Sequence, residues 1–242
     1  PVVLFADTFN RYFEPENLRA AIRVLRAAGY DVFAPTPAAG RPYCCGRTYL
    51  SAGMVDKARA EAERLVMALY PLARSGVRIV GLEPSCTLAL RDEVPALLGT
   101  AQAEAVADAT LTFAELIEAD RPDLPVPAAA SRRPVKLHGH CHQKAFDLVK
   151  PAEAVLRDIA GAEVEVIETS CCGMAGAFGY GRDTYDVSIH MAEASLLPAV
   201  RAAPDDAAIV ADGTSCRCQI DDGTGREAVH LARHLDRLIS GS

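Results

Sequence analysis

The sequence predicts an α/β protein made of two pseudo-symmetric βαβ-type units, each with a parallel sheet, related by internal duplication. Apolar strand segments alternate with helical segments in both halves of the 242 residues, which is the rhythm of a parallel sheet. Three sequence landmarks also recur in the same order at nearly constant spacing, which is typical of two copies of one unit.

The three landmarks are two strand-to-loop segments and a cysteine triplet. Their near-constant spacing places corresponding residues of the two halves in register. The aligned pairs, with their offsets, are Val3–Thr8 and Lys136–Cys141 (133), Cys44–Gly46 and Cys171–Gly173 (127), and Pro84–Cys86 and Thr214–Cys216 (130).

The first unit, residues 1–120, begins with a short apolar strand and a helix whose apolar residues recur at helical spacing. Proline at the start and glycine at the end bound this helix. The expected elements are a strand at Val2–Phe5, a helix from Pro15 to Gly29, a strand at Tyr30–Phe33, a helix around Ala58–Leu69, a strand at Val77–Gly81 and a helix from Thr112 to Ala119.

Residues 121–134 contain four prolines and three alanines, which predicts a linker before a second unit at 135–242. His230 and His234 in the last helix of that unit are expected on its solvated surface. The expected elements are strands at Val135–His138, Glu163–Ile167 and Ala208–Ala211, helices at Ala152–Ile159, Tyr185–Leu197 and Glu227–Ile239, and a loop at Gly213–Cys218.

Composition narrows the class of protein. The net charge of −7 provides no basic surface for nucleic acid or an anionic membrane, and no apolar run approaches the roughly 20 residues that span a bilayer.

The chain begins at Pro1 without a leader pattern, so we expect an excised piece of a longer cytoplasmic polypeptide. Eight cysteines in a large acidic chain then favour metal ligation over a disulfide scaffold.

Five cysteines of the second unit follow predicted strands, where a parallel sheet presents its loops to a ligand. Zinc and iron–sulfur clusters both bind thiolates, commonly four of them. Five thiols with one adjacent pair exceed what a single zinc ion uses, so the pattern favours a polynuclear cluster. The five are Cys141, Cys171, Cys172, Cys216 and Cys218.

These cysteine segments resemble the cysteine-rich CCG domain of the heterodisulfide reductase B subunit and the glycolate oxidase iron–sulfur subunit. The resemblance covers essentially the whole chain and is strongest to the C-terminal part of flavin-linked D-lactate or 2-hydroxyacid dehydrogenase fusion proteins. It implies a 4Fe-4S type cluster on the five cysteines, with His140, His142 and Gly173 around it.

The chain departs from the family pattern in both units. Cys216 and Cys218 are separated by one residue instead of two, and Thr8 stands where the first unit should have its leading cysteine. Ala89 replaces another cysteine there. The remaining Cys44, Cys45 and Cys86 are expected to form a second or vestigial metal site, with zinc as the alternative to no metal.

The resemblance implies an electron-transfer module of an oxidoreductase. An upstream FAD domain would oxidise the 2-hydroxyacid, ferredoxin-like domains would accompany it, and this chain would pass electrons to an unidentified acceptor, through which it would be peripheral to a membrane. No catalytic residue is assigned, and the chain alone is not expected to oxidise substrate. The alternatives are a heterodisulfide-reductase-like thiol/disulfide redox domain and a zinc-stabilised interaction domain.

Overall fold

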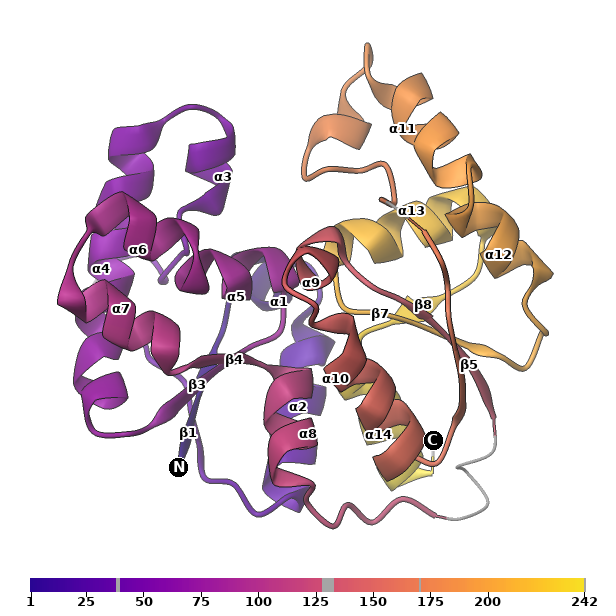
Figure 1. Ribbon diagram of the computed structural model, residues 1–242, viewed down its shortest axis with the longest axis horizontal. Helices are drawn as coiled ribbons and strands as arrows, with labels where there is room; N and C mark the ends of the chain where they lie inside the picture. The colour runs from indigo at the N-terminus through magenta and orange to yellow at the C-terminus, as the bar shows by residue number, and fades with distance from the viewer. Residues whose placement is uncertain (38–39, 128–132, 170, 242) are drawn as a thin grey trace. The chain divides into compact units, whose positions relative to one another are not determined.

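In the computed structural model, residues 1–37, 40–127, 133–169 and 171–241 are described. The chain divides into two compact units, Pro1–Leu116 and Ile117–Ser242, and each is built on one four-stranded parallel sheet (Figure 1). The boundary falls within α8 (Phe113–Asp120). Part of the expected linker, residues 128–132, lies outside the described residues.

The first unit has the strand order β2-β1-β3-β4, and all three pairings are parallel. β1 is fully buried because helices cover the sheet, as parallel sheets require. The strands are β1 (Val2–Phe5), β2 (Val32–Phe33), β3 (Arg78–Gly81) and β4 (Thr110–Thr112). The helices before α8 are α1 (Thr8–Tyr12), α2 (Pro15–Ala27), α3 (Arg47–Ser51), α4 (Val55–Arg74), α5 (Pro84–Arg91), α6 (Glu93–Leu98) and α7 (Ala101–Asp108).

The second unit has the order β6-β5-β7-β8, again with parallel pairings throughout. Its strands are β5 (Pro134–His138), β6 (Glu163–Val166), β7 (Ala208–Ala211) and β8 (Ala228–Val229). Its helical elements are α9 (Cys141–Ala145), α10 (Val149–Ala154), the π-helix η1 (Val155–Ile159), the 3-10 helix η2 (Phe178–Tyr180), α11 (Tyr185–Glu193), α12 (Leu196–Ala202), α13 (Thr214–Thr224) and α14 (Leu231–Ser240).

The two strand orders are identical when β5 to β8 are matched with β1 to β4. This confirms the predicted α/β class and the internal duplication. The helices connect parallel neighbours, as crossovers must. Each unit has its own apolar core, and cysteines belong to both cores: Cys45 and Cys86 in the first, Cys172 and Cys216 in the second.

The structure corrects several expected elements near the strand ends. The segment expected as a loop at 213–218 is the start of α13, so Cys216 and Cys218 lie on a helix. Short helices also follow β1 and β5, where none was expected, because Asp7 and His140 cap their first turns. The expected helix at 185–197 is interrupted before Leu196 and forms α11 and α12.

The expectation that His230 and His234 face solvent is wrong. Both are buried, at 1% and 7% exposure. His230 caps α14 by accepting a hydrogen bond from the Ala232 amide at 3.0 Å, and its Nε2 lies 3.5 Å from Asp212 Oδ1. His234 lies on the apolar face of α14 with Leu235. Within the described ranges, no helix has the length and hydropathy of a membrane span.

Burial of His234 predicts an acid-sensitive second unit. Burial, and then the charge of Arg237, lower the pKa of His234 to about 4, whereas an unfolded histidine has a pKa of about 6.5. Between pH 6.5 and pH 4, His234 is therefore protonated in the unfolded chain but neutral in the folded unit. As a result, this residue should lower the free energy of unfolding by about 2 kcal/mol between pH 7 and pH 5.

Denaturant titrations across this pH range should show a smaller loss in His234→Gln, which cannot be protonated. His190→Gln, a change at an exposed histidine of α11, should leave the acid loss in place. Equal acid losses in the wild type and His234→Gln would contradict the prediction.

Candidate metal centre

The cysteines of the second unit gather at the carboxyl ends of β5, β6 and β7. Cys141 begins α9 after β5, and Cys216 lies in the first turn of α13 after β7. The chain leaves β5 for β6 on one side and later returns to β7 on the other. Such a reversal opens a crevice at the strand ends, where α/β sheets bind ligands. Cys171 and Cys172 follow β6 and come to the same edge.

The glycine of each Cys-Cys-Gly triplet has a left-handed backbone, with φ of 81° at Gly46 and 90° at Gly173. This conformation turns the glycine amide back toward the first cysteine. The Gly173 N–H donates to Cys171 Sγ at 3.3 Å, and the Gly46 N–H donates to Cys44 Sγ at 3.5 Å. The same local structure therefore holds the first sulfur in both units.

A second constraint on Gly173 is the close approach of α11. A Cβ atom at this position would lie 2.1 Å from the Ser188 carbonyl oxygen. Gln219 of α13 donates to the same carbonyl at 3.3 Å and to the Ser188 hydroxyl at 3.2 Å. The triplet therefore packs against α11, and hydrogen bonds from Gln219 connect α11 to α13, the helix that bears Cys216.

Four of the five predicted thiols form a row in which each thiol contacts the next. Cys141 contacts Cys171, Cys171 contacts its neighbour Cys172, and Cys172 contacts Cys216. Cys141 is exposed, Cys171 is half-buried, and Cys172 and Cys216 are buried. Three sequence-distant segments therefore contribute sulfur to one cluster of thiols that is open to solvent at the Cys141 end.

The contacts shift the pKa values of the four thiols in opposite directions. The pKa of Cys171 is lowered well below its usual range, chiefly because the thiols on either side donate to it, with help from the Gly173 amide. The Cys172 thiol and the His138 imidazole lower the pKa of Cys216. The pKa values of the two donating thiols are raised correspondingly.

The fifth thiol, of Cys218, is placed differently. Residues two apart on a helix point about 200° away from one another, because each residue turns the helix by about 100°. Cys218 accordingly projects from α13 on another side than Cys216, where its thiol contacts the hydroxyl of Tyr180. The single-residue spacing noted in the sequence is the reason for this separation.

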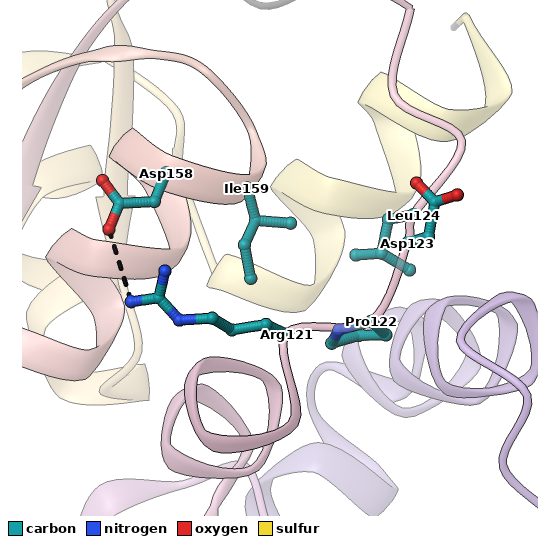
Figure 2. Close-up of a pocket in the computed structure, with 6 residues that line it drawn as sticks. All are labelled: Arg121, Pro122, Asp123, Leu124, Asp158 and Ile159. Carbon is teal, nitrogen blue, oxygen red and sulfur yellow. Dashed lines mark ion pairs between the residues drawn. The ribbon is translucent and has the colours of Figure 1, made fainter.

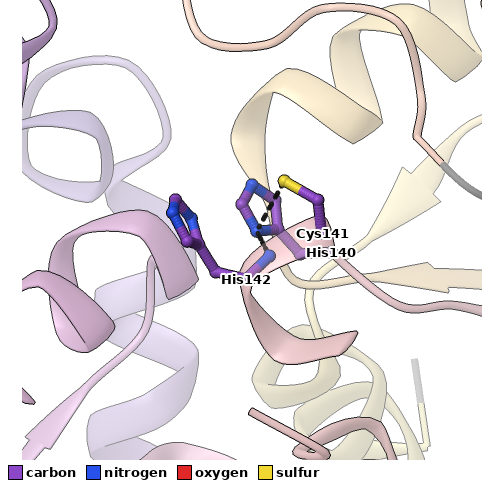
Figure 3. Close-up of side chains that lie close together, drawn as sticks. All are labelled: His140, Cys141 and His142. Atoms are coloured by element: carbon purple, nitrogen blue, oxygen red, sulfur yellow. Dashed lines mark hydrogen bonds between the residues drawn. The ribbon is translucent and has the colours of Figure 1, made fainter. Parts of the chain in front are cut away.

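Two histidines predicted near the cysteines lie at the start of α9 (Figure 3). His140 Nδ1 accepts the His142 amide at 3.1 Å, and Cys141 Sγ lies 3.8 Å from the same nitrogen. The two rings stack with centroids 5.3 Å apart. Ligand atoms of these three residues lie within 4.8 Å of one another, a donor set that zinc accepts. The capping bond at His140 Nδ1 competes with metal binding there.

Sequence reasoning missed the roles of His138 and Lys144. His138 Nδ1 lies 3.3 Å from the Thr169 hydroxyl, its ring lies against Cys216, and its buried Nε2 has no nitrogen or oxygen partner among the described residues. Lys144 Nζ donates to the Thr169 carbonyl at 2.6 Å and to the hydroxyl at 2.8 Å. The position of His138 at the end of a buried strand could have indicated a functional role from the sequence. No local sequence pattern sets Lys144 apart from the other lysines.

The first unit brings Cys44, Cys45 and Cys86 together in the corresponding places. Cys45 contacts both other thiols, and the Thr8 hydroxyl contacts Cys44 as Cys141 contacts Cys171. Each cysteine of the first unit thus has a counterpart in the second unit. Thr8 supplies a hydroxyl where the second unit has a thiol.

The charges around the first-unit thiols are acidic. Asp7 and Glu83 are buried, at 1% and 3% exposure. Burial and then the Glu83 charge raise the pKa of Asp7 to about 6. Although the Cys45 thiol acts in the opposite direction, burial and these two carboxyl groups raise the pKa of Cys86 to about 11. The acidic surroundings therefore disfavour the thiolate form of Cys86.

A separate pocket of about 310 Å³ lies elsewhere in the second unit (Figure 2). Its side chains precede β6 or follow α8, so it is at the opposite edge of the sheet from the thiols. Arg121 and Asp158 form an ion pair of 3.6 Å across it. The pocket is lined by Arg121, Pro122, Asp123, Leu124, Asp158 and Ile159.

Comparison with known proteins identifies the same family in both units. The family model described as the CCG cysteine-rich domain matches residues 5–91 and 135–221, one match in each unit. Both matches span the strand ends and the triplets described above.

The chain is similar to three curated proteins over nearly all of its length. One subunit of the anaerobic glycerol-3-phosphate dehydrogenase of Escherichia coli is 27% identical over 247 residues, covering 99% of this chain and 59% of the relative. D-2-hydroxyglutarate dehydrogenase of Escherichia coli is 28% identical, covering 98% of this chain and 22% of the relative. The corresponding figures for the Pseudomonas putida enzyme are 30%, 95% and 21%. The chain therefore spans less than two thirds of each relative.

The packing around the triplet predicts different costs for two glycine substitutions. Gly173 and Gly176 both have positive φ, but a Cβ at Gly176 meets nothing within 4 Å. Gly176→Ala should lower the free energy of unfolding by about 1 to 2 kcal/mol from backbone strain alone. Gly173→Ala should cost roughly 1 to 3 kcal/mol more, because α11 must move to relieve the clash. Denaturant unfolding measures both, and equal losses would show that the α11 contact is unimportant.

Proposed function

Because the chain belongs to the CCG cysteine-rich domain family, we propose that its second unit holds an iron–sulfur cluster of the 4Fe-4S type and transfers electrons within a larger oxidoreductase. The observation that carries this proposal is the contact of four thiols from three strand ends at the switch point of the sheet. When bound, such a cluster supplies a one-electron carrier.

The residues at this site suit a cluster with four thiolate ligands. The proposed ligands are Cys141, Cys171, Cys172 and Cys216, and contacts with neighbouring groups lower the pKa of Cys171 and of Cys216. Hydrogen bonds to sulfur tune such centres, and the Gly173 amide already points at one ligand sulfur. We propose Cys218 as a neighbour rather than a ligand, and the contact of its thiol with Tyr180 supports this.

The residues around the ligands have separate tasks in this proposal. Cys172 and Cys216 are buried and exclude water from one side of the site, whereas Cys141 is exposed and marks the side where electrons enter or leave. The His138 imidazole lies against Cys216, where its Nε2 can donate a hydrogen bond to the ligand sulfur. His140 holds Cys141 in place by capping its helix.

We propose no cluster for the first unit. Thr8 replaces one thiol, and the buried carboxyl groups of Asp7 and Glu83 disfavour the thiolate form of Cys86. Cys45 still contacts both Cys44 and Cys86, so the three thiols lie together. A zinc ion remains the candidate metal for these three thiols.

The proposed enzyme context is a flavin-linked oxidoreductase that acts on a 2-hydroxyacid. The support is that two relatives are named for D-2-hydroxyglutarate and that all three continue well beyond the aligned region. A hydride equivalent would pass from the hydroxyl-bearing carbon to FAD in another domain. This chain would receive the two electrons singly and deliver them to an acceptor.

Zinc in the second unit is the second candidate, and a specific observation favours it. His140, Cys141 and His142 place three suitable ligand atoms within 4.8 Å of one another. A zinc-stabilised domain would carry no electrons. Visible absorption and metal analysis of anaerobically prepared protein separate the two, because zinc gives no visible band.

Paired cysteine substitutions in the two units test the ligand assignment. Cys171→Ser with Cys172→Ser should remove most iron and acid-labile sulfide, since two of four proposed ligands are lost. The matched change, Cys44→Ser with Cys45→Ser, alters the corresponding triplet of the first unit and should leave both contents unchanged. Iron and sulfide assays on anaerobically purified protein measure this. Full iron in the first variant would exclude the proposed site.

Kinetics of the complete enzyme test the proposed division of labour. In the full-length protein, Cys171→Ser with Cys172→Ser should leave the reduction of flavin by the 2-hydroxyacid nearly unchanged, because no cysteine contacts the substrate in this proposal. Electron delivery to an external acceptor should become much slower. Stopped-flow absorbance follows the two steps separately. Loss of flavin reduction in a folded variant would contradict the proposal.

A further inference from the structure

Lys144 connects the helix that bears Cys141 to the loop that bears the other triplet. Its ammonium group donates to both the carbonyl and the hydroxyl of Thr169, at 2.6 and 2.8 Å. Thr169 lies two residues before Cys171, and Lys144 lies three residues after Cys141 on α9. One side chain therefore joins two of the three segments that supply thiols.

The surroundings hold this side chain in place. Val149 and the Lys144 stem lie so close to Gly139 that an added Cβ there would be 2.5 Å from Val149 Cγ2 and 3.3 Å from Lys144 Cε. The Thr169 hydroxyl that accepts from Lys144 is also 3.3 Å from His138 Nδ1. The ammonium is thus one end of a short polar chain that reaches the imidazole beside Cys216.

The ammonium is also a charge close to all the proposed ligands. Lys144 interacts electrostatically with the Cys141, Cys171, Cys172 and Cys216 thiols. The corresponding surroundings in the first unit contain the buried carboxyl groups of Asp7 and Glu83, which act on Cys86. A positive charge beside an iron–sulfur centre stabilises its more negative, reduced state, and so raises its reduction potential.

We infer that Lys144 is a positioning residue for the proposed cluster, which ties the Cys171 loop to the Cys141 helix and raises the reduction potential through its charge. This inference rests on the proposed function, because it requires a redox centre on these thiols. It assigns a role to a residue that binds no metal and touches no substrate.

Three substitutions separate the charge from the connection. Lys144→Arg keeps the charge and donors, Lys144→Gln keeps a donor but removes the charge, and Lys144→Met removes both. The matched control is Lys150→Gln on α10, since Lys150 is exposed and pairs with Asp147 at 2.6 Å. Each protein is prepared anaerobically and analysed for iron, sulfide, circular dichroism, midpoint potential and the rate of iron loss to a chelator.

We expect Lys144→Gln and Lys144→Met to have more negative midpoint potentials than the wild type. Lys144→Arg and Lys150→Gln should stay close to the wild-type potential. Lys144→Met should also lose iron to the chelator several-fold faster than Lys150→Gln, because the Cys171 loop is no longer tied to α9. If all variants remain folded, retention of iron by Lys144→Arg and Lys150→Gln with loss of iron from Lys144→Gln and Lys144→Met would also support the inference.

Three results would overturn the inference. An unchanged midpoint potential in an iron-replete Lys144→Gln would exclude the effect of the charge, and an unchanged rate of iron loss in Lys144→Met would exclude the connection. Loss of iron from a folded Lys144→Arg would show that neither charge nor donors suffice. Failure of the proposed function looks different, because the wild type and Lys150→Gln would then lack iron and sulfide as well.

Discussion

The strand order β6-β5-β7 is the constraint on which the second unit depends. Because the three strands are parallel, their carboxyl ends share one edge of the sheet, and the loops that follow them must meet there. Cys141, the 171–172 pair and Cys216 follow these three strands. Thiols separated by up to 75 positions therefore come into contact through backbone hydrogen bonding of the sheet, before any metal contributes.

The two units show how one backbone arrangement can support different chemistry. Their strand orders are the same, and the left-handed glycine directs its amide at the first sulfur in both. The side chains around that backbone differ in charge: Lys144 stands beside the second-unit thiols, and Asp7 with Glu83 beside those of the first. Ionisation of a thiol is easier near a cation and harder near an anion, so the same backbone frame places its thiols in different electrostatic surroundings in the two units.

Much of the fold followed from local patterns. The parallel α/β class, the duplication and most strands could be predicted because apolar periodicity and repeated spacing are properties of the sequence itself. The helical start of α13 could not, because Gly213–Cys218 lacks an apolar period, and its helix is stabilised by packing of buried residues such as Ile220. The burial of His234, in contrast, could have been predicted, because it lies three residues after Leu231 and one turn before Leu238 on the apolar stripe of α14.

The sequence by itself determined the cysteine inventory, the two triplets and the missing thiol at Thr8. Only the tertiary structure decided which thiols meet, because contact depends on side-chain direction at the end of each strand or along a helix. It separated Cys218 from Cys216 by the rotation of α13. It also brought Lys144 to Thr169 across 25 residues of chain, a proximity that arises from the β5–β6 pairing and leaves no local pattern in the sequence.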